Sequence, residues 1–137
     1  MGLKLQILKA STSGEINTAF AAFAQERPDA LLVAAGALFE IRRVQLVHLA
    51  SRHAIPASYS GREFVEAGGL MSYGPKRVES FRQVGAYTGR ILKGDKPSDL
   101  PVVQPTKFEF VINAHTAGLI GIEVPVTLLA QADEVIE

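Results

Sequence analysis

The stretch Ala30-Leu31-Leu32-Val33-Ala34-Ala35 is a continuous apolar run that is too short for a typical helix. Such a run is typical of a strand buried on both faces of a parallel sheet. After a loop at 36–39, apolar residues recur at helical spacing over 41–52, and 55–59 is a second short apolar run. The order strand, helix, strand predicts an α/β unit near the centre of the chain.

The same alternation continues outward from this unit. Upstream, we expect a first strand at 3–8, from Leu3, Leu5, Ile7 and Leu8, and a helix at 15–26. Downstream, we expect a polar loop or short helix at 60–66, strands at 70–73 and 107–113, a helix at 78–92, a short helix at 116–120 and a helix at 127–136. A chain of 137 residues is large enough for one domain with a core. We therefore expect a single α/β lobe over 1–137, three-layered and Rossmann-like (flavodoxin-like), with a mainly parallel sheet between helices.

Composition argues against several classes of protein. Acidic and basic residues balance at 14 each, without a block of five like charges, so no nucleic-acid partner is expected. The absence of cysteine excludes disulfides, thiolate metal sites and thiol nucleophiles. No stretch approaches the roughly 18 to 20 apolar residues of a membrane span. The first ten residues also lack the long apolar run and the cleavage site of a secretory signal.

The motifs of common enzymes are missing. No loop has the dinucleotide spacing G-x-G-x-x-G or the phosphate-binding spacing G-x-x-x-x-G-K-[ST]. Ser60 lies in Ala-Ser-Tyr-Ser-Gly, which is not the nucleophile motif G-x-S-x-G. His48, His53 and His115 lack the i, i+4 spacing that places two imidazoles on one metal ion. We expect no catalytic residue, no metal and no cofactor.

A binding site is more consistent with the loops that follow the predicted strands. Ligands of open α/β sheets lie at the carboxyl ends of strands, here the loops at 36–39, 58–63 and 72–76. Arg62 offers a planar fork for a carboxylate, Glu63 can accept from an ammonium, and Tyr59 or Tyr73 can cover an apolar body. The alternative is that Arg62 and Glu63 only face water or pair with each other. The candidate ligand-binding residues are Phe39, Tyr59, Ser60, Arg62, Glu63 and Tyr73.

Several longer runs resemble a known family. The run REFVEAGGLMSYGP at 62–75 is similar to the signature of ABC transporter substrate-binding proteins whose better-known members bind tryptophan or tyrosine. The resemblance continues through RILKG at 90–94, QPTKFE at 104–109 and ADEVI at 132–136. It covers nearly the whole chain, and it implies a type I periplasmic binding fold and a non-enzymatic function.

The resemblance implies the second, carboxyl-terminal lobe of a two-lobed clamp that holds a small polar solute, such as an amino acid or a carboxylate, for an ABC permease. This chain has Gly36-Ala37 where relatives carry Asp-Pro, which removes a polar contact and leaves the solute open. The family is periplasmic or lipid-anchored, whereas this chain, having no recognisable signal sequence, is expected to stay in the cytoplasm.

In such a protein the helix within 78–94 would cross to the first lobe. Without that lobe, we expect Val78, Phe81, Val84 and Ile91 to be covered by their own sheet or by a second copy, in a homodimer that can be swapped through 78–94. Two other functions stay open: a stand-alone dimeric effector or assembly module, and a small α/β enzyme that uses Arg62 and Glu63.

Overall fold

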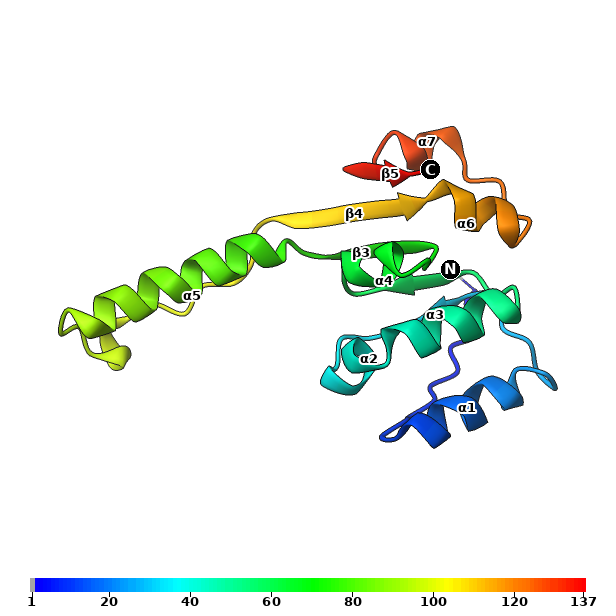
Figure 1. Ribbon diagram of the computed structural model, residues 1–137, viewed down its shortest axis with the longest axis horizontal. Coiled ribbons are helices and arrows are strands. Elements are labelled where there is room, and N and C mark those ends of the chain that lie inside the picture. Colours follow the sequence, from blue (N-terminus) through cyan, green and yellow to red (C-terminus); the bar gives the residue numbers. More distant parts are fainter. Residues whose placement is uncertain (1) are drawn as a thin grey trace.

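The computed structural model describes residues 2–137 and has two parts (Figure 1). A body contains the sheet and most of the helices, and an arm, residues 77–106, extends from one edge of it. The helices are α1 (Ser13–Ala22), α2 (Ala37–Ile41), α3 (Arg43–Arg52), α4 (Arg62–Glu66), α5 (Arg77–Leu92), α6 (Ala114–Leu119) and α7 (Val126–Leu129), with a 3-10 turn η1 (Pro97–Asp99). The strands are β1 (Leu31–Leu32), β2 (Ala57–Tyr59), β3 (Met71–Pro75), β4 (Phe108–Asn113) and β5 (Glu134–Ile136).

The five strands form one mainly parallel sheet in the order β1-β2-β3-β4-β5, so the predicted α/β class is confirmed. Three neighbouring pairs are parallel, and β3 and β4 are antiparallel, in register from Met71 opposite Ile112 to Pro75 opposite Phe108. Because β3 ends and β4 begins at the same edge of the sheet, the segment that connects them can extend away from the body. The arm is this connecting segment.

The core lies between one face of the sheet and the helices of the body. Tyr59 on β2 stacks on Phe64 of α4, with ring centroids 4.8 Å apart. Ile16 and Phe20 of α1 belong to the same buried cluster, and the Thr12 side chain caps this helix by accepting from the Glu15 amide. Burying a side chain of this size contributes roughly 1.5 to 3 kcal/mol, so this cluster is the main source of the body's stability.

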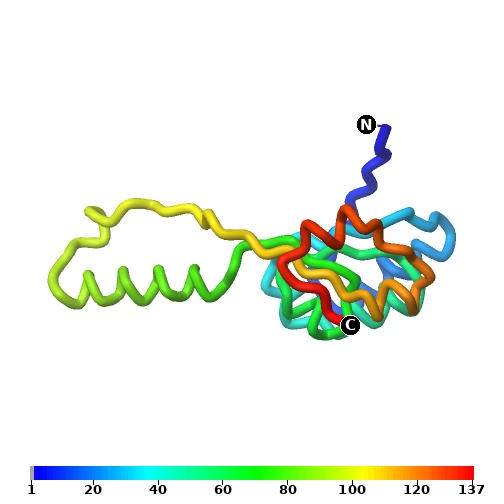
Figure 2. Tube along the Cα trace, turned by 90° about the horizontal axis from the view of Figure 1, so that it is seen from above, coloured from blue at the N-terminus to red at the C-terminus, as the bar shows by residue number. Residues whose placement is uncertain are grey.

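The predicted first strand is wrong. Residues 2–10 are extended, but they form no ladder with another strand within the described chain. Leu3 and Leu5 are 83% and 82% exposed, and Figure 2 shows this segment leaving the body. Alternating apolar residues favour a strand, but a strand also needs a neighbouring backbone, and β1 pairs only with β2 here.

Two further expectations need correction. The run at 30–35 is not buried on both faces, since Leu32 on the edge strand β1 is 76% exposed while Val33 is buried. The helix expected at 127–136 ends at Leu129, and the last residues form β5 beside β4. Asp133 begins this pairing, because its amide donates to the Phe110 carbonyl and its carboxylate accepts from the Phe110 amide, both at 2.8 Å.

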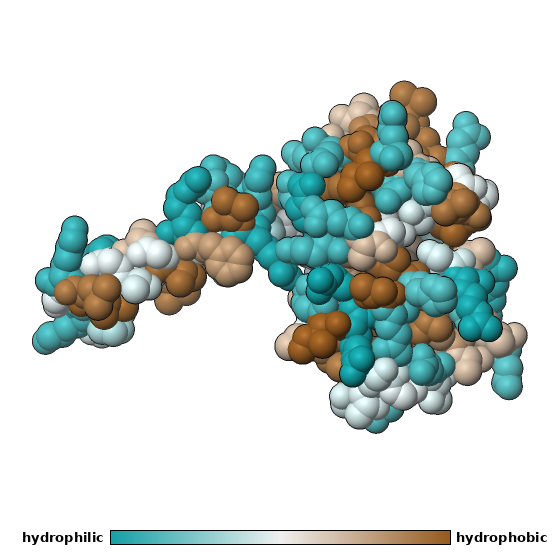
Figure 3. All heavy atoms as spheres, in the orientation of Figure 1, coloured by the Kyte–Doolittle hydropathy of each residue, from teal (hydrophilic) through white to brown (hydrophobic). Residues whose placement is uncertain are grey.

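The long helix of the arm is present as predicted, but its own sheet does not cover it. No residue of α5 is buried, and Val78, Phe81 and Val84 are 62%, 70% and 61% exposed. Figure 3 shows apolar residues at the surface along the arm. The return segment is tied to α5 by the Tyr87 hydroxyl, which donates to the Pro101 carbonyl at 2.6 Å. The alternative expectation, cover by a second copy, stays a prediction.

Among residues 2–137, no helix combines the length and the apolar character that crossing a bilayer requires.

Candidate functional site

One edge of the sheet gathers most of the polar side chains that sequence reasoning selected. The carboxyl ends of β1, β2 and β3 meet there, and so do the amino ends of β4 and β5, because these two strands run antiparallel to β3. We call this region the polar edge. It consists of Glu40, Ser60, Gly61, Arg62, Glu63, Glu66, Lys76, Arg77, Glu109 and Glu134.

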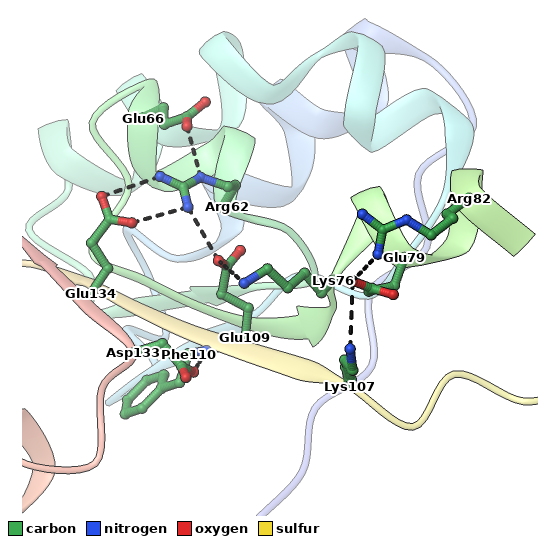
Figure 4. A network of polar contacts seen from close by, with 10 residues as sticks. All are labelled: Arg62, Glu66, Lys76, Glu79, Arg82, Lys107, Glu109, Phe110, Asp133 and Glu134. Atoms are coloured by element: carbon green, nitrogen blue, oxygen red, sulfur yellow. Dashed lines mark hydrogen bonds and ion pairs between the residues drawn. The ribbon is translucent and has the colours of Figure 1, made fainter.

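Arg62 lies at the centre of the first cluster of the polar edge (Figure 4). Its Nε donates to Glu66 Oε1 at 2.8 Å, and its Nη1 lies 3.2 Å from Glu109 Oε1 and 3.0 Å from Glu134 Oε2. The Nη2 donates to the other oxygen of Glu134 at 3.2 Å. Hydrogen bonds with Glu66 and Glu134 raise the pKa of Arg62 above its ordinary value. One guanidinium therefore joins the start of α4 to β4 and β5.

Arg77, the first residue of α5, lies at the centre of the second cluster. Its Nη2 is 2.6 Å from Glu40 Oε1 on α2, and its Nη1 is 3.2 Å from Glu63 Oε1 on α4. The second oxygen of Glu63 and the Ser60 hydroxyl are both removed from solvent and have no hydrogen-bond partner within the described residues. A buried acceptor without a donor costs roughly 1 to 3 kcal/mol. Such unpaired groups are rare in folded proteins, and each of them calls for an explanation.

Two glycines leave room for the Ser60 backbone and for the Glu63 carboxylate. A Cβ on Gly74 would lie 1.9 Å from the Ser60 carbonyl oxygen, so only glycine lets β3 approach the loop after β2 this closely. A Cβ on Gly61 would lie 2.7 Å from Glu63 Oε2. The Glu63 carboxylate is therefore folded over the backbone of Gly61.

The structure brings together three of the six predicted residues and separates the other three. Ser60, Arg62 and Glu63 lie at the polar edge. Phe39 on α2 is partly buried and packs against the core. The alternative expectation that Arg62 and Glu63 pair with each other is wrong, because each has its own partners.

Neither of the two candidate tyrosines lies at the polar edge. Tyr59 is 1% exposed and belongs to the core, where burial raises the pKa of its hydroxyl above the ordinary value. Tyr73 is exposed, but it points away from the face that buries Ser72, because successive strand residues alternate. Its ring stacks on Phe108, with centroids 5.4 Å apart. An aromatic pair therefore lies near the base of the arm, on the sheet face opposite α4.

Five residues of the polar edge lie outside the loops that the sequence selects: Glu40, Glu66, Arg77, Glu109 and Glu134. Glu40 directly follows the selected loop at 36–39, and Arg77 directly follows the loop at 72–76. A window one residue wider would therefore have included both. Glu109 and Glu134 are 47 and 72 residues from Arg62 along the chain. They lie at strand beginnings, and only the antiparallel direction of β4 brings these beginnings to the same edge.

The polar edge can form ion pairs and hydrogen bonds with a small polar molecule. Residues 2–137 contain no group of three or more histidine, aspartate or glutamate side chains placed to hold a metal ion. The groups present at this edge, carboxylates, guanidinium groups and a hydroxyl, are of the kind that orient polar ligands.

Comparisons with known proteins identify the family and the fold. The family model described as ABC transporter substrate binding protein matches residues 1–136. No curated protein sequence matches the chain. Three solved structures are similar, and the chain covers less than half the length of each.

An ABC domain from Streptococcus pneumonia in complex with L-Trp superposes with a TM-score of 0.88 and 27% identity, over 98% of this chain and 46% of that one. A conserved domain protein from Vibrio cholerae gives a TM-score of 0.84 and 25% identity, over 92% and 42%. A ligand-free, open substrate binding protein with adhesive properties from Clostridium difficile gives 0.61 and 22%, over 93% and 42%, and shows the fold alone. The family model and the first two structures lead to one conclusion: this chain belongs to the ABC transporter substrate-binding protein family.

Proposed function

We propose that this chain is a solute-binding lobe, the carboxyl-terminal half of a two-lobed receptor that delivers a small polar solute to an ABC permease. The observation that carries the proposal is the superposition of 98% of the chain on a domain that is complexed with L-Trp. Binding of this kind requires a shaped, polar surface and no catalytic group.

The polar edge is the surface that would meet the solute. In α/β sheets the ligand lies outside the carboxyl ends of the strands, which is where Ser60 and Glu63 stand. Unpartnered acceptors at such an edge support a role in binding, because a ligand that donates hydrogen bonds would relieve their cost. Arg62 holds Glu66, Glu109 and Glu134 through ion pairs, and Arg77 pairs with Glu63 in the unliganded chain.

The arm supports the part of the proposal that concerns a second lobe, because it offers a surface on which such a lobe could pack. Its exposed residues Val78, Phe81 and Val84 form an apolar face that is costly to leave in water. The solved structures that this chain resembles are more than twice as long as the part it matches. Two partners would cover this apolar face: the other lobe of a two-lobed receptor, or a second copy of this chain in a homodimer swapped through 78–94. A periplasmic location is part of the proposal, and the family resemblance supports it.

Isothermal titration calorimetry with a panel of amino acids, including L-tryptophan and L-tyrosine, and of small amines and carboxylates tests the proposal. We expect at least one amino acid to bind, and its saturating concentration to raise the midpoint of thermal unfolding. A ligand at a hundred times its dissociation constant stabilises the folded state by about 2.7 kcal/mol. If no amino acid, amine or small carboxylate binds, the solute-binding proposal is wrong and an assembly role is favoured.

A matched pair of variants locates the site. Glu63→Gln changes a carboxylate of the polar edge, and Glu123→Gln changes an exposed carboxylate after α6. We expect weaker binding in the first variant and unchanged binding in the second. Equal binding in both would move the site away from the polar edge.

A further inference from the structure

The cationic side chains of the polar edge are already committed to carboxylates. All three nitrogens of the Arg62 guanidinium lie within 3.2 Å of an oxygen of Glu66, Glu109 or Glu134. The Arg77 guanidinium is likewise held by Glu40 and Glu63. A solute carboxylate would have to displace these partners, and it would bring a further negative charge to them. Arg62 is therefore poorly suited to the carboxylate recognition that its sequence context suggests.

Acceptors, by contrast, are in excess. The ion pairs of the polar edge join five carboxylates, from Glu40, Glu63, Glu66, Glu109 and Glu134, to three cationic side chains, so two negative charges are uncompensated. The third cation, Lys76, reaches Glu109 only at 3.9 Å. The two acceptors without a partner, Glu63 Oε2 and Ser60 Oγ, lie in the same loop region.

The Glu63 side chain is partly accessible to a ligand. It is 33% exposed as a whole, although its unpartnered Oε2 is covered. The terminal torsion of glutamate has a broad energy minimum, so the carboxylate can rotate toward a ligand without any movement of the backbone. The Ser60 hydroxyl, at the end of the same loop, is a second group without a partner.

From these contacts we infer that the polar edge recognises the protonated amine of its solute, through the Glu63 carboxylate with the Ser60 hydroxyl of the same loop, and that it does not recognise a carboxylate through Arg62. The inference rests on the proposed function and deepens it by naming the ligand chemistry: small molecules that carry a primary ammonium group. For a zwitterionic amino acid, this lobe would take the amino end. Arg77 acts as a competitor that occupies Glu63 in the unliganded state.

The test uses probes that share one apolar skeleton and differ in the polar group. Tryptamine carries only the ammonium, indole-3-propionate only the carboxylate, and L-tryptophan both. Isopentylamine, 4-methylpentanoate and L-leucine repeat the comparison on an aliphatic skeleton. Affinities are measured by calorimetry with the full chain. We expect the amine of at least one series to bind and its matched carboxylate to bind at least tenfold more weakly, about 1.4 kcal/mol.

Two variants separate recognition from a merely structural ion pair. Glu63→Gln should weaken amine binding about tenfold, because the amide oxygen still accepts a hydrogen bond but the negative charge that strengthens it is lost. Arg77→Gln should strengthen amine binding several-fold, because it releases the Glu63 carboxylate. A purely structural pair predicts that both variants weaken binding alike, and that result would overturn the inference. Glu123→Gln is the unaffected control.

The outcomes distinguish the two proposals. Tighter binding of the carboxylate probes than of the matched amines overturns the inference about the ammonium and leaves the solute-binding function in place. The absence of binding by every probe and every amino acid of the panel overturns both.

Discussion

Phe64 on α4 and Phe81 on α5 are both aromatic residues on amphipathic helices, yet the first is 0% exposed and the second 70%. The helix that carries Phe64 is five residues long and the helix that carries Phe81 is sixteen. Helix length and apolar periodicity therefore do not decide burial here. What decides it is whether the sheet lies beneath the helix, as it does for the body and does not for the arm (Figure 1). The following predictions test that difference.

The largest difference is expected for truncation of these two phenylalanines. Phe64→Ala removes a fully buried ring stacked on Tyr59 and should lower the free energy of unfolding by about 3 to 5 kcal/mol. Phe81→Ala at micromolar concentration should change it by less than about 0.5 kcal/mol. Urea denaturation followed by circular dichroism measures both. A concentration-dependent loss for Phe81→Ala would show that a second copy covers the arm.

The second comparison uses two glycines. Gly74→Ala places a methyl group against the Ser60 carbonyl, and we expect a loss of about 1 to 3 kcal/mol or more, because backbone must move. Gly85→Ala in the arm meets no atom within 4 Å and should stabilise α5 by up to about 1 kcal/mol through helix propensity. Thermal melts of the two variants should therefore shift in opposite directions. A destabilised Gly85→Ala would indicate a close contact of the arm with a partner.

A smaller difference is expected between two arginines. Arg62→Gln breaks ion pairs that connect α4, β4 and β5, and should cost about 1 to 2 kcal/mol, since each half-exposed pair contributes about 0.2 to 1 kcal/mol. Arg82→Gln in the arm removes only the exposed pair with Glu79 and should leave the urea midpoint unchanged. The effect of Arg62→Gln should shrink in 1 M salt. Equal effects of both variants would contradict a role of Arg62 in joining the elements.

The smallest effect at neutral pH concerns Tyr59. Burial raises the pKa of its hydroxyl in the folded state, so the folded chain keeps the proton while the unfolded chain loses it above about pH 10. The stability that this difference contributes is complete below pH 10 and is lost as the pH rises further, by up to about 1.4 kcal/mol per pH unit. Tyr59→Phe should therefore flatten the alkaline decline of the urea midpoint. An identical decline in the variant would show that other groups cause it.

Part of the polar edge could be predicted and part could not. Ser60, Arg62 and Glu63 follow a short apolar run directly, so the rule that ligands lie beyond strand ends was enough to select them. The carboxylates that occupy Arg62 could not be found in this way, because the direction of β4 is a property of the sheet. Tyr59 and Tyr73 were selected as aromatic residues near a loop, and strand alternation assigned one to the core and the other to the opposite face.

The sequence by itself determined the α/β class, the helix of the arm and the family, because these depend on local periodicity and on runs of specific residues. The tertiary structure alone decided that residues 2–10 have no strand partner, that Leu32 lies on an open edge and that Val135 belongs to a strand. It also decided that Arg62 is saturated while Glu63 keeps a free oxygen. The physical reason is the same in each case: pairing and burial depend on neighbours that are distant in the chain.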